Sequence, residues 1–542
     1  MHAVQRLCSG MSHPGPEADS VSFKWRPDRS LLLPLAIYLV AAVLMWKGVI
    51  ARADEISYTL DDAYIHAALA KNLVAHGTLG IVPGEFSAAS SSPLWTLILA
   101  LGFAIAGFQA WVPGILATVF GALAIERAHA CLKTLGLGPM TRSFVVCLAM
   151  IYAPVLPVLS TGMEHLLHIW TMLGLFNALL RAVPEAPKRP FAIFIWAILA
   201  AGARYESLFI LPPLLLWLAW RRNWRTAFAL GGGMSVPVLA FAACSMSHGG
   251  YPLPNSLMLK GNFEAFDLWI GIKRLIDWPY LSIPVLLMAI ATVFLIVSGR
   301  GLRLAWFPIT IIVLTLIHLE LAKLGWFWRY EAYLTVLGII SASTLLIPLR
   351  EWLKGRHWLV LVVVQSLLVF STLPLLFRSI LANAQIVPAV GNIHDQQVQM
   401  ARVGRLLGPQ ARIAVNDLGA MAFFTDAHVL DLWGLGDNRI TRAKRDHYMN
   451  SDFLRQRLLE DHTEYVICYP SWFLPPAALP DTLIPVERWH LNGNIICGAE
   501  DVYFYGTSPE AAQKLTDALT RYRLDFPADP RSTNQIKPIA TK

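Results

Sequence analysis

Charged residues are scarce in this chain. Asp, Glu, Lys and Arg make up only 15% of its 542 residues, whereas hydrophobic residues make up 56%. A soluble globular domain typically carries about 25% charged residues, so this composition excludes a soluble protein and predicts a membrane protein with several spans. The net charge of +8 comes from Lys and Arg that cluster between apolar runs. Such clusters are typical of membrane topology signals, and we therefore expect no nucleic-acid partner.

Cysteine is also scarce. The six cysteines, at positions 8, 131, 147, 244, 468 and 497, form no C-x-x-C pair and no metal-ligand spacing, which argues against zinc and thiol redox chemistry. Only Cys468 and Cys497 share a polar region, where a disulfide in an oxidising compartment and two buried free thiols are equal alternatives. The sequence also lacks an internal repeat. Its first apolar run lacks a small-residue cleavage site, which favours a retained anchor over a signal peptide.

Apolar runs and basic clusters together predict the topology. The first run, residues 31–50, has the length of about 20 residues that a bilayer span requires, and it follows a basic cluster. Because such clusters stay in the cytoplasm, we expect residues 1–30 to be cytoplasmic. We interpret residues 93–107 as a juxtamembrane helix within an external loop, residues 52–110, since counting them as a span would place a basic cluster outside. About 11 spans then cover residues 31–377.

The composition changes to that of a soluble domain at about residue 378. The segments ARIAVND, AHVLDLWG, TEYVICY and DVYFYG are predicted strands, and FLRQRLLEDH is a predicted helix. We expect an extracytoplasmic α/β domain over residues 378–524 and a disordered tail over residues 525–542. The predicted fold class is an α-helical polytopic membrane protein with a C-terminal extracytoplasmic α/β domain.

Two adjacent acids, Asp61 and Asp62, follow the first predicted span. At the boundary between water and lipid an ionised carboxylate is costly unless it is solvated, paired or used in chemistry. Asp61 is placed to cap the helix that follows, and capping needs only one of the two acids. His66 lies one helical turn after Asp62, where a carboxylate and an imidazole can meet one substrate hydroxyl. The alternative is a capped interfacial helix without chemistry.

The unusual polar groups near the predicted spans all fall on the outer side. They are Asp61, Asp62, His66, Glu85, Glu164, His165, Arg204, Glu206, Lys260, Arg329 and Glu331. Acids and cations on one face suit transfer from a lipid phosphate, because a carboxylate removes the proton of the acceptor hydroxyl and cations hold the leaving phosphate. A metal site is the weaker interpretation, since few of these acids and histidines are close in sequence.

Six fragments in order resemble the bacterial GT-C membrane glycosyltransferases. They are DDAYI, PGE with SSPLW, STGME, R-x-E, PLPNSLMLK and WFWRY. The resemblance is closest to the branch of the mycobacterial terminal arabinofuranosyltransferase, and the aminoarabinose transferase of lipid A and the protein O-mannosyltransferases are more distant. It implies an inverting enzyme of the bacterial plasma membrane that moves a monosaccharide from a polyprenyl phosphate to a cell-envelope glycan, lipid or protein on the outer face. It implies no certain cofactor and leaves a divalent cation open.

The resemblance also implies roles for individual residues. The general base falls in the acid pair, where we favour Asp62 over Asp61. Lys260, Arg204 and Arg329 are the expected ligands of the donor phosphate; their alternatives are a solvated loop end, a pair with Glu206 and a snorkelling side chain, respectively. The expected sugar or acceptor pocket comprises His66, Glu85, Glu164, His165, Glu206, Asn255 and Trp326. His165 and Tyr205 depart from the usual residues of the family, so the donated sugar stays open.

Three other functions compete with this interpretation. A transporter or flippase of lipid-linked sugars predicts charges at mid-span and repeat-related helices, and neither is visible. Transfer of a whole oligosaccharide from a polyprenyl-diphosphate carrier differs in the phosphate count of the donor. A non-catalytic partner in cell-envelope assembly would use mainly the external domain.

Overall fold

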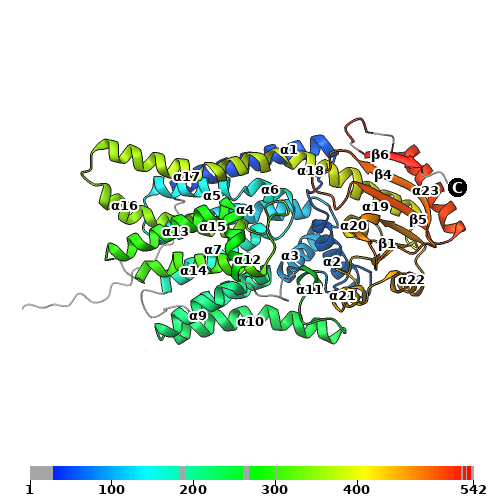
Figure 1. The fold of residues 1–542 in the computed structure, drawn as a ribbon, viewed down its shortest axis with the longest axis horizontal. Helices are drawn as coiled ribbons and strands as arrows, with labels where there is room; N and C mark the ends of the chain where they lie inside the picture. Colours follow the sequence, from blue (N-terminus) through cyan, green and yellow to red (C-terminus); the bar gives the residue numbers. More distant parts are fainter. Residues whose placement is uncertain are drawn as a thin grey trace, which may run out of the picture.

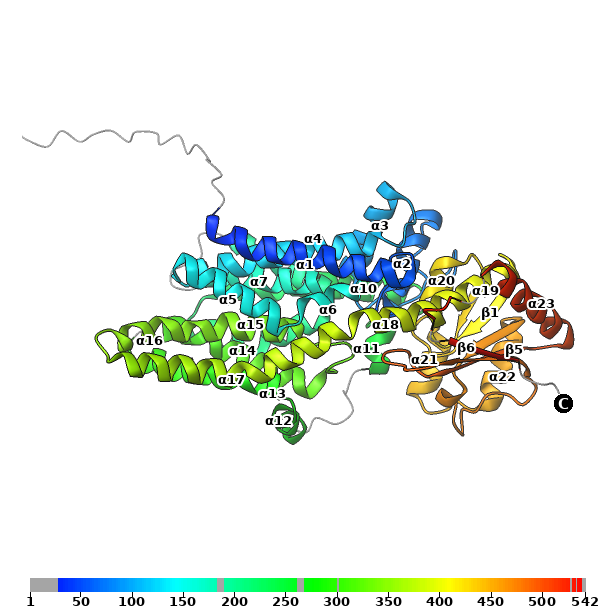
Figure 2. The same ribbon diagram turned by 90° about the horizontal axis from the view of Figure 1, so that it is seen from above.

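The structure is a computed structural model that describes residues 28–182, 190–260, 268–299, 302–526, 529–532 and 534–538. The molecule is elongated, with a bundle of helices at one end and a mixed β-sheet at the other (Figures 1 and 2). Helices α2, α3, α11, α20 and α21 lie where the two parts meet, so the loop over residues 52–110, which the sequence predicts to be external, is in contact with both.

Seven helical stretches among the described residues are long and apolar enough to cross a membrane, by length and composition. They are Arg29–Ala53 (α1), Val112–Thr134 (α4), Trp224–Ser247 (α10), Pro279–Val297 (α13), Leu304–Leu321 within α14, Ala332–Leu353 (α15 and α16) and the stretch that starts at Trp358 (α17). Shorter apolar helices are Pro93–Ala106 (α3), Pro139–Tyr152 (α5), Pro190–Ala203 (α8) and Tyr205–Trp220 (η1 and α9). The remaining helices of this part are α2 (Asp62–His76), α6 (Val155–Ser160), α7 (His165–Ala182), α11 (Asn255–Lys260) and α12 (Leu268–Asp277).

Helix α1 shows why this part of the chain belongs in a bilayer. Tyr38, Ala42, Met45 and Val49 recur at helical spacing and are buried against the bundle, whereas large apolar side chains on the other faces stay exposed. The same holds for α17, whose Leu367 and Phe370 are more than 60% exposed. Apolar surface of this extent is unfavourable in water and favourable in lipid.

Helix α3 corresponds to the predicted juxtamembrane helix. Ser92 caps it, since its Oγ accepts a hydrogen bond from the backbone N–H of Trp95 at 3.3 Å, and Pro93 occupies the first turn, where no partner for its nitrogen is needed. The helix packs beside α2, at the end of the bundle nearest the sheet (Figures 1 and 2). The first external loop is therefore a helical hairpin that carries the two acids at its start.

The C-terminal domain is a six-stranded sheet with helices, so the predicted α/β class is confirmed. The strand order is β2-β1-β3-β5-β4-β6; β2, β1 and β3 are parallel, and β5, β4 and β6 pair antiparallel. The strands are β1 (Arg412–Val415), β2 (His428–Asp431), β3 (Tyr465–Cys468), β4 (Ile484–Leu491), β5 (Asp501–Gly506) and β6 (Asn534–Pro538). The helices are α18 (Ile386–Ile393), α19 (Gln399–Leu407), α20 (Gly419–Phe424), α21 (Asn438–Arg445), α22 (Ser451–Glu460) and α23 (Pro509–Asp525).

One expectation about this domain needs correction. The tail over 525–542 is not wholly disordered, because residues 534–538 form β6 and pair with β4, which would otherwise expose an unpaired edge. Helix α17 continues to Ala384, past the boundary predicted at residue 378. Cys468 and Cys497 are both buried free thiols, which decides between the two alternatives for this pair.

Candidate active site

Asp61 joins the first external loop to the C-terminal domain. It occupies the N-cap position of α2, but its side chain does not cap that helix. Its two carboxylate oxygens instead accept hydrogen bonds from the backbone N–H groups of Gly419 at 2.5 Å and Ala420 at 2.8 Å, at the start of α20. A side chain at position 419 would collide with the backbone of Asp61, so only glycine fits there. The predicted cap of α2 is therefore wrong, because tertiary contact gives this carboxylate a different helix end.

Asp417 forms a carboxyl pair with Asp61. Burial raises the pKa of Asp61 to about 6, although the N–H groups of α20 oppose the shift. Burial, together with the neighbouring charges of Asp61 and Asp62, raises the pKa of Asp417 well above its usual range. Tyr469 and Gln397 donate to the Oδ2 atom of Asp417 at 3.2 Å and 3.1 Å. Asp417 therefore keeps its proton to a higher pH than a solvent-exposed carboxyl group does.

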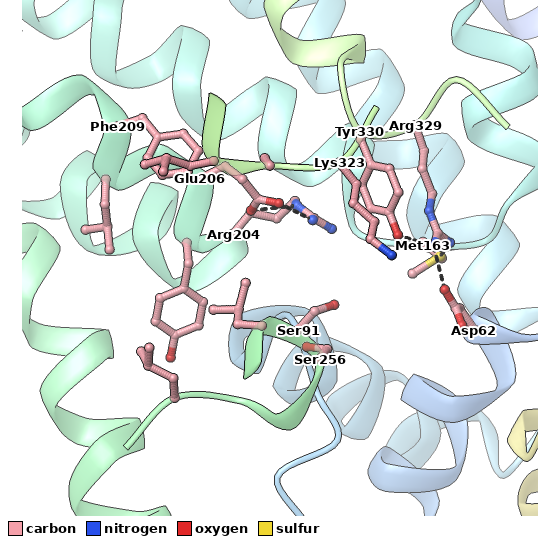
Figure 3. Close-up of a pocket in the computed structure, with 16 residues that line it drawn as sticks. Asp62, Ser91, Met163, Arg204, Glu206, Phe209, Ser256, Lys323, Arg329 and Tyr330 are labelled. Carbon is pink, nitrogen blue, oxygen red and sulfur yellow. Dashed lines mark hydrogen bonds and ion pairs between the residues drawn. The ribbon is translucent and has the colours of Figure 1, made fainter. Parts of the chain in front are cut away.

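Asp62 points the other way, toward the helical bundle. The Nη2 atom of Arg329 donates to its Oδ2 atom at 2.5 Å, and the side chain of Asp62 is 22% exposed (Figure 3). The guanidinium of Arg329 is buried, and it also contacts the sulfur of Met163 at 2.8 Å and the hydroxyl of Tyr330 at 2.8 Å. An accessible carboxylate thus lies against a buried cation.

A strained turn holds Arg329 in this place. Gly325, Trp326, Phe327 and Trp328 all have positive φ angles, from 45° to 75°. A left-handed conformation costs roughly 1–2 kcal/mol for each non-glycine residue, so neighbouring contacts must stabilise the turn. Glu331 supplies them, because its carboxylate accepts a hydrogen bond from the backbone N–H of Gly325 at 2.9 Å and pairs with Arg378 of α17.

Arg204 is held by two acids. Its Nη1 atom lies 2.5 Å from the Oε1 atom of Glu164, and its other donors pair with Glu206 (Figure 3). His66 lies on the far side of Glu164, with Nε2 3.6 Å from Oε2. Glu164, Glu206 and Arg204 are all buried. The predicted pair of Arg204 with Glu206 exists, and a second acid joins it.

Two cavities meet at Asp62. The first, which we call the basic cavity, measures about 230 Å³. Its polar lining is Asp62, Ser91, Arg204, Glu206, Ser256, Lys323, Arg329 and Tyr330, and its apolar lining includes Met163, Leu208, Phe209, Leu253, Leu257 and Leu321. Arg329 and Asp62 lie at one end of it and Phe209 at the other, while the ammonium of Lys323 points between them (Figure 3).

The second cavity, which we call the tryptophan cleft, measures about 310 Å³ and lies between the first loop, the strained turn and the C-terminal domain. It is lined by Leu60, Asp61, Asp62, Leu259, Lys323, Leu324, Trp326, Tyr330, Ile393, Asn416, Asp417, Leu418, Trp433, Leu435, Trp472, Ile496 and Gly498. Asp62, Lys323 and Tyr330 therefore border both cavities.

The remaining predicted site residues lie in different places relative to the two cavities. Trp326 lines the tryptophan cleft, and Glu206 lines the basic cavity. His66, Glu164 and His165 are buried and line neither cavity, so the predicted meeting of His66 with a substrate hydroxyl is not seen; His66 faces Glu164 instead.

Two further predicted residues, Asn255 and Glu85, line neither cavity. Asn255 is buried and donates to the carbonyl of Leu435 and the side chain of Asn438, which ties α11 to the C-terminal domain. Glu85 is exposed on the loop after α2. Lys260 ends α11, and its side chain lies outside the part of the chain that the structure describes.

Sequence reasoning missed Lys323 and Asp417 as site residues. Lys323 begins the segment that contains W-F-W-R-Y, and Asp417 ends the segment ARIAVND, a predicted strand. Their position in those segments was the available signal. Among the described residues, no group of three or more His, Cys, Asp or Glu has an arrangement that would hold a metal ion.

Comparison with solved structures shows the fold. ArnT from Cupriavidus metallidurans bound to undecaprenyl phosphate superposes with a TM-score of 0.51 at 12% identity, covering 88% of this chain and 98% of that chain. Its apo state gives a TM-score of 0.51 at 13% identity. An apo oligosaccharyltransferase from Archaeoglobus fulgidus gives 0.52 at 11% identity, covering 92% of this chain and 78% of that chain. The chain therefore has the GT-C fold of a multi-pass membrane protein.

Sequence comparisons add one match. A family model described as a domain of unknown function (DUF8728) matches residues 391–506, which lie within the C-terminal domain. In a comparison with curated proteins, none matches this chain.

Proposed function

We propose that this protein is an inverting glycosyltransferase that moves a monosaccharide from a polyprenyl-phosphate donor to a cell-envelope acceptor on the outer face of the bacterial plasma membrane. The observation that carries the proposal is the position of Asp62. An accessible carboxylate lies where a basic cavity meets a second cleft, so a donor and an acceptor can approach it from opposite sides. The GT-C fold supports the same chemistry, and the superposed ArnT structure is bound to undecaprenyl phosphate.

The basic cavity suits a phosphate that carries a lipid tail. Arg329 and Lys323 supply positive charge, and the hydroxyls of Ser91, Ser256 and Tyr330 supply hydrogen-bond partners. Arg204 also lines the cavity, but Glu164 and Glu206 neutralise it. Arginine binds phosphate through two parallel hydrogen bonds, whereas lysine acts as a point charge. The apolar side chains that line the same cavity, among them Phe209 and Leu208, suit the first prenyl units.

The reaction then proceeds as a single displacement at Asp62. The acceptor hydroxyl oxygen attacks the anomeric carbon of the sugar, and the bond between that carbon and the phosphate oxygen breaks. The carboxylate of Asp62 takes the hydroxyl proton, and the bonding electrons leave with the polyprenyl phosphate. Arg329 and Lys323 stabilise the charge that develops on this leaving group. Attack from the side opposite the phosphate inverts the configuration.

Sugar transfer by the purified protein in liposomes tests the proposal. With a panel of polyprenyl-phosphate monosaccharides, we expect one donor to be consumed and Asp62→Asn to lower transfer about 100-fold or more, because a positioned general base contributes about 10²–10⁴-fold. Donor binding should persist in this variant, since the substitution keeps size and polarity. Glu85→Gln is the matched control, because this acid of the same loop lies in neither cavity.

Other results would favour other functions. If Asp62→Asn transfers sugar at the rate of the wild type, the assignment of the base is wrong. If no monosaccharide donor is consumed and a polyprenyl-diphosphate oligosaccharide is, the carrier is a diphosphate. If lipid-linked sugar crosses the bilayer without being cleaved, the protein is a transporter or flippase.

A further inference from the structure

We propose that the tryptophan cleft binds a neutral saccharide and is the acceptor site of the enzyme, which gives the C-terminal domain its role. The acceptor role rests on the proposed function, whereas saccharide binding depends on the cleft alone. Asp62 lines the cleft as well as the basic cavity, and the far wall of the cleft belongs to the matched domain of unknown function.

The tryptophans of the cleft are available to a ligand. Trp326 is 50% exposed and Trp433 and Trp472 are partly exposed, whereas Trp95 and Trp489 of the protein core are completely buried. An indole offers a large apolar face and costs little conformational entropy when it is covered. The apolar C–H face of a sugar ring matches such a surface, and its hydroxyls remain at the edge of the contact.

The indoles of the C-terminal domain are fixed before a ligand arrives. The Nε1 atom of Trp472 donates to the carbonyl of Gly498 at 3.1 Å, and a side chain at position 498 would collide with the Trp472 ring. The ammonium of Lys444 lies 3.2 Å from the centre of the Trp433 ring, a cation–π contact. The two ring centres are 4.5 Å apart with planes at 58°, so the indoles form a rigid corner. A surface that is already ordered loses less free energy on binding.

Polar groups beside this corner match sugar hydroxyls. The Nδ2 atom of Asn416 is buried and has no hydrogen-bond partner among the described residues, although its Oδ1 atom accepts from the backbone N–H of Tyr469. A buried donor without a partner is costly, and a ligand oxygen would satisfy it. Asp417 adds a carboxyl group at the same wall.

The charge of the cleft selects a neutral ligand. Asp61 and Asp62 are the charged acids of its lining and Lys323 is the cation, while the raised pKa of Asp417 reduces its share of the negative charge. An acceptor with phosphate or carboxylate groups would meet like charge on this side. The basic cavity has the opposite balance, so the two cavities differ in the charge of the ligand that they favour.

Saccharide binding is measured without donor or turnover. The full-length protein in lipid nanodiscs is applied to a printed array of neutral and phosphorylated cell-envelope oligosaccharides, and each hit is measured as the soluble oligosaccharide by saturation-transfer NMR and calorimetry. Nanodiscs replace alkyl-glycoside detergents, whose head groups are sugars. We expect Trp472→Ala and Trp433→Ala each to weaken binding about tenfold or more, and Tyr448→Ala, an exposed aromatic of the same domain, to leave it unchanged.

The test separates this inference from the proposed function. A protein that binds oligosaccharide through Trp472 but consumes no lipid-linked donor keeps the saccharide site and loses the transferase. Transfer with an unchanged acceptor KM in both tryptophan variants, or array binding by phosphorylated glycans alone, overturns the saccharide site and leaves the transferase. In an active enzyme, Trp472→Ala should raise the acceptor KM while the slow hydrolysis of the donor by water persists.

Discussion

At the scale of single residues, the three cations that line the basic cavity are unequal. Arg204 is shared by Glu164 and Glu206, so two acids more than neutralise it. Arg329 pairs with Asp62, whose other neighbours leave it 22% exposed. Lys323, which sequence reasoning passed over, is exposed and borders both cavities. Of the two arginines, Arg329 is therefore the one that is placed to exchange its carboxylate for a phosphate.

Arg329→Lys tests the guanidinium at constant charge. Lysine keeps the positive charge but cannot contact Asp62, Tyr330 and Met163 together, so we expect transfer to fall about tenfold or more. Steady-state kinetics with varied donor should show a higher donor KM as well as a lower kcat. Arg439→Lys is the control, since the Arg439 side chain is 57% exposed on the C-terminal domain. Unchanged kinetics in Arg329→Lys would remove this residue from the site.

At the scale of elements, the start of α20 controls how the first loop meets the C-terminal domain. The Asp61 carboxylate accepts hydrogen bonds from the first two backbone N–H groups of this short helix, and Asp417 hydrogen-bonds to Asp61. Both carboxyl groups have raised pKa values in the folded protein. Their contribution to stability is therefore fully present below the ordinary carboxyl pKa, near 4. The share of Asp61 is lost as the pH rises through about 6, and the share of Asp417 is lost as the pH rises through its own raised pKa.

Asp417→Asn should reduce this pH dependence. Asparagine keeps a donor beside Asp61 but cannot ionise, so the variant should lose less thermal stability than the wild type between about pH 4 and pH 7. The change in slope reports how much of the pH dependence comes from Asp417. Differential scanning fluorimetry at constant ionic strength measures it. Asp481→Asn, an exposed acid of the same domain, serves as control, and equal slopes for Asp417→Asn and wild type would contradict the coupling.

At the scale of the whole molecule, the cavities lie at the end of the bundle that faces the sheet. The turn between α16 and α17 lies at the opposite end (Figures 1 and 2). Basic clusters predict that this turn is cytoplasmic and that the C-terminal domain is extracytoplasmic. The sequence thus predicts which end of the long axis of the molecule lies on which side of the membrane.

Cysteine labelling of intact cells tests this orientation. In a chain with Cys244→Ser, which removes an exposed thiol, Glu510→Cys on α23 should react with a membrane-impermeant maleimide once the reagent reaches the outer face of the plasma membrane. Lys354→Cys, in the turn after α16, should react only after that membrane is opened. The reverse pattern would place the C-terminal domain in the cytoplasm.

The sequence by itself determined the membrane class, the presence of a C-terminal α/β domain and the acid pair. These features depend on composition and on spacing within short segments, which one can read without knowing which segments touch. The strands at 412–415 and 465–468 can also be predicted from the sequence alone, because the continuous apolar run of a buried strand is a local signal. Strand β6 cannot be predicted in this way, because its stability comes from pairing with β4.

The tertiary structure decided what each polar group does. Asp61 and Asp62 are neighbours in sequence, yet one accepts backbone N–H groups of the C-terminal domain and the other pairs with Arg329. The tryptophan cleft is lined by the first loop, by the strained turn and by residues of the C-terminal domain between Ile393 and Gly498. Hydrogen bonds and cavities act over a few ångströms between such segments, so no pattern within one segment encodes them. Only the folded chain places a carboxylate, a cation and three indoles around one cleft.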